Sequence, residues 1–121
     1  MRIGIPIYHS RVSPVFDFSH RLVIAEGDKE GMKKSRKEII LSGLEFHERA
    51  KTLKEAGIEI IICAGISGML MKELFSLGIE VLSGIVGDVE EVLVAYEQGK
   101  LNESRFFMPG GYLQRWRQEE E

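Results

Sequence analysis

The stretch IEIIICAGISG at residues 58–68 decides the fold. Its first six residues are almost all apolar and β-branched, which is typical of a central strand covered on both faces. The AGISG that follows predicts a tight turn into a helix, and Gly78 is placed to end that helix. We therefore expect this strand in the middle of a sheet, with its carboxyl end leading directly into a helix.

The residues before this stretch indicate three strands. Residues 2–8 place their three isoleucines on one face at a period of two, as in a half-buried strand. Residues 21–25 read as a second strand, and 26–31 as a turn. Residues 32–41 are rich in lysine, which fits a strand at a sheet edge because charge there opposes edge-to-edge pairing. Together the three segments predict an antiparallel meander.

Helices and strands alternate in the rest of the chain. Phe46, Ala50 and Leu53 fall on one face of a helix, residues 79–86 read as another strand, and Asp88 caps a third helix. The expected order is therefore β-β-β-α-β-α-β-α. It predicts an α/β fold of ribonuclease-H-like architecture, with a mixed five-stranded sheet and helices on its faces.

Composition narrows the class of protein. The chain has 121 residues, 44% of them hydrophobic, and a net charge of −3. We expect a single domain over residues 1–113 and a charged, solvated tail over 114–121. The acidic balance gives no case for nucleic-acid binding, and the apolar runs are too short to cross a membrane. With no signal-peptide pattern at the start, we expect a cytoplasmic protein.

The chain contains one cysteine, Cys63. A single cysteine excludes an intrachain disulfide, a four-cysteine zinc site and an all-thiolate cluster site built from one chain. Any metal–sulfur cluster must therefore be held by few protein ligands, by two chains, or mainly by backbone dipoles.

The loop after the first strand, RVSPVFDFSHR at residues 11–21, concentrates polar side chains. One interpretation is that Ser13 and Asp17 satisfy the backbone of the loop while Phe16 plugs the core. The other is a ligand-binding loop, in which His20 ligates a metal or donates to an anion and Asp17 orients it.

Two further segments follow strand ends, where ligands bind in open α/β sheets. In the first, Gly65 allows close backbone approach and the helix after Ser67 favours anions. Cys63, just before it, is either a small buried hydrophobe or a ligand. In the second segment, Gly87 and Asp88 open a helix, and the simplest role of Asp88 is a helix cap.

Several of these motifs together resemble the dinitrogenase iron–molybdenum cofactor biosynthesis family. The resemblance covers about residues 2–111 and rests on IPIY at 5–8, RVSPVFD at 11–17, RL at 21–22, ICAGIS at 62–67, VGDVEEVL at 86–93 and FMPG at 107–110. It implies a ribonuclease-H-like fold without known catalysis, which binds or carries iron–sulfur or iron–molybdenum cofactor precursors.

The chain departs from the family pattern at two places. Val15 stands where nitrogenase accessory members often carry a histidine, and Gly111 stands where relatives often carry a cysteine. These departures leave His20 and Cys63 as the candidate metal ligands.

We therefore expect a non-catalytic carrier that holds an iron–sulfur or iron–molybdenum cluster transiently and passes it to a protein partner, as a monomer or an oligomer. The expected cofactor-binding residues, with Phe16 as a wall, are Arg11, Ser13, Phe16, Asp17, His20, Gly65, Ser67, Gly87 and Asp88.

One alternative is an interaction or regulatory module of the same fold that has lost the cofactor. Another is a small-molecule enzyme using His20 and Asp17. A nuclease is rejected because the first strand has no acid to hold metal ions.

Overall fold

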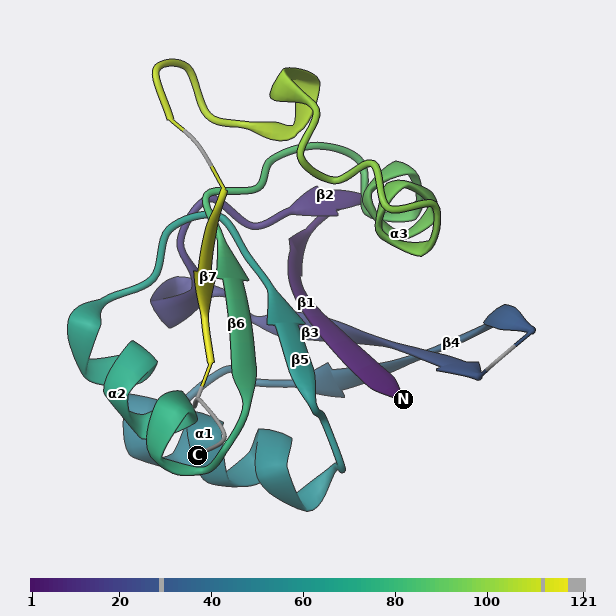
Figure 1. Ribbon diagram of the computed structural model, residues 1–121. Helices are drawn as coiled ribbons and strands as arrows, with labels where there is room; N and C mark the ends of the chain where they lie inside the picture. The colour runs from purple at the N-terminus through teal and green to yellow at the C-terminus, as the bar shows by residue number, and fades with distance from the viewer. Residues whose placement is uncertain (29, 112, 118–121) are drawn as a thin grey trace, which may run out of the picture.

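The computed structural model describes residues 1–28, 30–111 and 113–117 (Figure 1). Its helices are α1 (Phe46–Glu55), α2 (Gly68–Ser76) and α3 (Val89–Glu97). Its strands are β1 (Arg2–Tyr8), β2 (Arg11–Val12), β3 (Arg21–Asp28), β4 (Gly31–Ile40), β5 (Ile60–Ile62), β6 (Glu80–Ser83) and β7 (Gln114–Trp116).

The strands form one mixed sheet in the order β4-β3-β1-β5-β6-β7, with β2 paired to β1. The pairs β3–β4 and β1–β3 are antiparallel, whereas β1, β5 and β6 run parallel to one another. The antiparallel meander followed by parallel strands confirms the ribonuclease-H-like architecture. The lysine-rich segment forms β4 at the edge of the sheet, as its charge predicts.

The sheet has seven strands rather than the expected five. One addition, β2, extends the hairpin that leaves β1. The other, β7, lies in the segment predicted as a charged tail: Gln114 to Trp116 are exposed, and they pair antiparallel with β6. The indole N–H of Trp116 also donates to the hydroxyl of Ser83 over 3.2 Å. A three-residue strand with exposed side chains has no periodic signal, so sequence periodicity does not indicate it. Residues 118–121 of the predicted tail lie outside the described residues.

Strand β5 divides the core into two clusters. Ile60 and Ile62 pack on one face, in a cluster that contains the β1 isoleucines and the inner face of α3. Ile61 and Cys63 face the other side, in a cluster with the buried residues of α1 and α2. Accordingly, α1 and α2 lie together on one side of the sheet and α3 lies on the other (Figure 1).

The parallel strands bring their carboxyl ends to one side of the molecule. Figure 1 shows the ends of β1, β5 and β6 at this side, together with the segment between α3 and β7. The loops that contain every predicted site residue therefore lie in one region.

We predict that β5 sets the stability of the fold. Ile61→Ala should lower the free energy of unfolding by about 2–5 kcal/mol, because it removes a fully buried side chain between the sheet and its helices. Ile40→Ala is the matched control, since Ile40 is 64% exposed on the edge strand, and it should change stability by less than about 0.5 kcal/mol. Urea unfolding of the two variants measures the difference, and equal losses would contradict this role for β5.

Candidate functional site

Loop 11–20 is joined to the turn after β5 by paired backbone hydrogen bonds. The amide of Phe16 donates to the carbonyl of Gly65 over 2.8 Å, and the amide of Gly65 donates to the carbonyl of Pro14 over 2.9 Å. A Cβ atom at position 65 would lie 2.9 Å from that same Pro14 oxygen. The close backbone approach predicted for Gly65 is therefore present, and the backbone of the loop occupies the space.

The same loop also contacts the turn before α3. The amide of Val12 donates to the carbonyl of Gly87 over 2.9 Å, and that of Val89 donates to Ser10 over 2.9 Å. Asp88 caps α3, because one of its carboxylate oxygens accepts from the amides of Glu90 and Glu91. The three predicted segments are thus brought together, with Asp88 in the capping role.

Asp17 bridges the loop to α2. One carboxylate oxygen accepts from the amide of Ser67 over 2.9 Å, and the other accepts from the Ser67 hydroxyl over 2.5 Å. The Ser67 hydroxyl in turn accepts from the amide of Leu70 and caps the helix. A carboxylate of the protein itself therefore stands where an anionic ligand was expected. Asp17 bonds to Ser67 instead of orienting His20.

Arg49 of α1 holds the other end of the loop, and sequence reasoning missed it. Its side chain is buried, and it donates to the carbonyl of Ser19 over 2.7 Å and to that of Leu44 over 2.9 Å. Burial lowers the pKa of the guanidinium, and the nearby charge of Asp17 opposes that shift. An arginine in a mostly polar helix gives no local signal of such a role, because its carbonyl partners are set by the tertiary fold.

Two predicted site residues belong to the core instead. Phe16 is fully buried in the cluster with α1 and α2, so it plugs the core rather than walling a site. Cys63 is also fully buried there, and burial, helped by the charge of Asp17, raises the pKa of its thiol to about 12. A thiol that stays protonated at neutral pH is a poor metal ligand. The structure does not bring Cys63 together with the exposed His20.

A cavity of about 300 Å³ lies beside loop 11–20 at the end of β1. His20 and Ser13 line it. His9 also lines it, although it is not among the predicted site residues; its only sequence signal is that it lies just before loop 11–20. Both histidines are exposed. His9 has a φ of 56°, in the left-handed region that is uncommon for residues other than glycine. Arg11, another predicted site residue, is exposed and its backbone bridges to Asp88.

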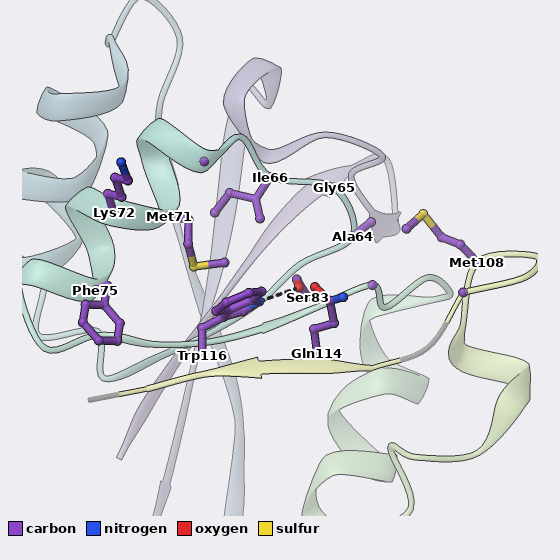
Figure 2. A pocket seen from close by; sticks show the side chains of 13 residues that line it. Ala64, Gly65, Ile66, Met71, Lys72, Phe75, Ser83, Met108, Gln114 and Trp116 are labelled. Atoms are coloured by element: carbon purple, nitrogen blue, oxygen red, sulfur yellow. Dashed lines mark hydrogen bonds between the residues drawn. The ribbon is translucent and has the colours of Figure 1, made fainter. Parts of the chain in front are cut away.

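A second, apolar cavity of about 650 Å³ lies between α2, the end of β6 and the segment that leads into β7 (Figure 2). Gly65 is the one predicted site residue in its lining, which also includes Met71, Met108 and Trp116. The adjacent Met69 is exposed and does not line the cavity. Residues two positions apart lie on nearly opposite sides of an α-helix, which explains why Met71 faces the cavity whereas Met69 faces solvent.

Among the described residues, no group of three or more histidine, cysteine, aspartate or glutamate side chains is arranged to hold a metal ion. Within the same part of the chain, no helix is long and apolar enough to cross a membrane.

Comparisons with known proteins agree with this architecture. Residues 1–99 match the family model described as dinitrogenase iron-molybdenum cofactor. Among curated proteins, none matches the chain.

Solved structures share the fold over most of the chain. The crystal structure of the protein PH0822 is 27% identical with a TM-score of 0.76, and the alignment covers 83% of this chain and 93% of that one. A candidate dinitrogenase from Methanocaldococcus jannaschii is 24% identical with a TM-score of 0.68, covering 83% and 90%. A candidate NifB protein from Thermotoga is 21% identical with a TM-score of 0.63, covering 88% and 96%.

We predict that Asp17 and Ser67 act as one structural unit. Asp17→Ala should lower the free energy of unfolding by about 1–2 kcal/mol, because two hydrogen bonds to a carboxylate are lost. Ser67→Ala should cost about 1 kcal/mol through the lost cap. If the pair is coupled, the double variant loses less than the sum of the two, as measured by denaturant unfolding. Strict additivity would mean that the bridge contributes nothing.

We also predict a thiol-dependent loss of stability in alkali. The unfolded thiol loses its proton near its ordinary pKa of 9.0, whereas the folded one keeps it to about 12. Between these values the folded state binds more protons than the unfolded state, so the free energy of unfolding falls as pH rises. Thermal unfolding followed across this window should show a steeper fall for the native chain than for Cys63→Ala. Parallel curves would contradict a buried, protonated Cys63.

Proposed function

The chain belongs to the dinitrogenase iron–molybdenum cofactor family, and from that premise we propose that it is a non-catalytic carrier of an iron–sulfur or iron–molybdenum type cofactor or precursor. The observation that carries the proposal is the pair of exposed imidazoles, His9 and His20, in one cavity at the end of β1. Imidazole nitrogen is a common ligand of iron. His9 comes from the turn between β1 and β2, and His20 from the end of loop 11–20.

A site with only two protein ligands favours release of the bound cluster to another protein. A cluster held by only two imidazoles keeps its remaining metal positions open to other ligands, including those of a receiving protein. The exposure of both histidines allows a partner to approach the cargo directly. The buried Cys63 thiol supplies no thiolate to compete with release. These features favour transient carriage over permanent housing.

The backbone at His9 supports a ligand role for its side chain. His9 and Ser10 form the two-residue turn between β1 and β2, and only His9 has a positive φ among the described residues that are not glycine. Such a conformation costs of order 1–2 kcal/mol, and glycine would avoid most of that cost. Strained residues of this kind cluster at binding sites, where the surrounding structure holds them.

The proposed role is non-catalytic because His20 and Asp17, the acid–base pair considered from the sequence, do not form a hydrogen-bonded pair. Asp17, the expected partner of His20, is engaged on both carboxylate oxygens by Ser67. A proton transfer through His20 would need a different acceptor.

A second candidate function is an interaction or regulatory module that uses the fold without cargo. The absence of a three-ligand group among the described residues favours it. Copurification distinguishes the two: a stoichiometric protein partner in preparations free of iron and molybdenum supports the module, whereas near one equivalent of bound metal supports the carrier.

Anaerobic reconstitution with iron and sulfide tests the carrier. We predict that the variant His9→Gly with His20→Ala retains roughly tenfold less iron than the native chain, with loss of the visible absorption of the cluster. Glycine is chosen at position 9 because it adopts the φ of 56° without strain.

The controls for this experiment lie on the same chain. His47→Ala removes the third histidine, which is exposed on α1 and contacts Glu73, so iron retention should not change. Cys63→Ala should likewise leave it unchanged. Equal retention in the two-histidine variant and the native chain, or an equal loss in His47→Ala, would overturn the proposal.

A further inference from the structure

The apolar cavity beside α2 is separate from the proposed cargo site. Its lining shares no residue with the cavity of His9 and His20. One wall is made by α2 and the turn before it, and the other by the segment that contains Met108 and Trp116. That second wall lies beyond residue 99, where the match to the family model ends. The cavity is therefore completed by a part of the chain that the family model does not describe.

Strand β7 places an aromatic face in this cavity. Trp116 pairs with Val81 in the register of β6 and β7, and its indole N–H is bonded to Ser83. The indole is thus held in one orientation, although the residue is 43% exposed. Figure 2 shows the side chain of Met71 reaching toward the indole from α2, with Phe75 at one end and Gln114 and Ser83 nearby. A fixed aromatic face beside open space is suited to stacking.

The chemistry of the lining selects the kind of ligand. Two methionines and two aromatic residues line the cavity, and their side chains adapt to and stack on flat ring systems. Four glycines, at 65, 68, 84 and 111, leave the walls open between the larger side chains. Lys72 carries the only charge in the described lining, and no carboxylate contributes to it. A cationic ligand is therefore disfavoured, whereas a neutral or anionic one is not.

From these observations we infer that the cavity binds a small, flat aromatic molecule, neutral or anionic, stacked on Trp116 between α2 and β7. A volume of about 650 Å³ is within the range of small-molecule sites. The inference goes beyond the proposed carrier function and does not depend on metal–sulfur cargo.

The chain's single tryptophan, Trp116, lines this cavity, so its fluorescence reports dye bound near it. The probe is N-phenyl-1-naphthylamine, a neutral aromatic dye. We expect saturable binding of one equivalent, with Trp116 emission transferred to the dye. The same titration on the variant His9→Gly with His20→Ala should be unchanged, so failure of the carrier proposal and failure of this one are distinguishable.

The main test of this site is a variant whose new side chain fills the cavity. Gly68→Leu adds a side chain at the first position of α2, where a Cβ atom would meet nothing within 4 Å. We expect it to weaken dye binding by roughly tenfold or more, because the leucine occupies the space of the ligand. Met69→Lys is the control: it removes an exposed apolar side chain next to the cavity and should leave binding unchanged. Equal binding by Gly68→Leu, or an equal loss in Met69→Lys, would overturn the inference.

Methionine methyl NMR of the native chain gives a second measurement that needs no variant. The chain has five methionines, of which Met71 and Met108 line the cavity. Ring currents of a bound dye should shift these two methyl signals and leave those of Met1, Met32 and Met69 in place. Shifts spread over all five, or confined to the latter three, would show surface adhesion and contradict the site.

Discussion

The burial of β5 on both faces is the constraint on which the rest of the structure depends. Its residues alternate between two core clusters, so elements must cover the sheet on both sides. The chain meets this requirement by crossing from strand to helix and back, which makes β1, β5 and β6 parallel. Parallel strands end on the same side of a sheet, and the loops after them are therefore gathered into one region. The location of the three predicted site loops follows from this single requirement.

Polar contacts then turn the gathered loops into a rigid assembly. Arg49 binds carbonyls at one end of loop 11–20, and Asp17 binds Ser67 at α2. Asp17 and Ser67 are also among the residues that the sequence predicts for the site. Because their hydrogen bonds are satisfied within the protein, they stabilise the site region rather than act in it. Among the side chains exposed there, His9 and His20 become the stronger candidates for binding a metal.

The two cavities divide along the chain as well as in space. The cavity with the two histidines lies wholly within residues 1–99, the part that matches the family model. The apolar cavity needs Met108 and Trp116, and so depends on β7 pairing with the outer edge of β6. A short edge strand is held by few hydrogen bonds, yet here it also carries one wall of a site. The two proposed sites are therefore divided between the part of the chain that matches the family model and the segment that follows it.

The sequence by itself determined the elements whose signals are local. The period of two in β1, the apolar run of β5 and the caps Ser67 and Asp88 depend only on neighbouring residues, and each element formed where its pattern indicated. Only the tertiary structure decided that Asp17 bonds to a residue fifty positions away, that Cys63 faces the core, and that three residues of the tail form β7. Periodicity and capping are set within a few residues, whereas the partner of a polar side chain and the pairing of a short strand depend on which distant segments the packed core brings alongside.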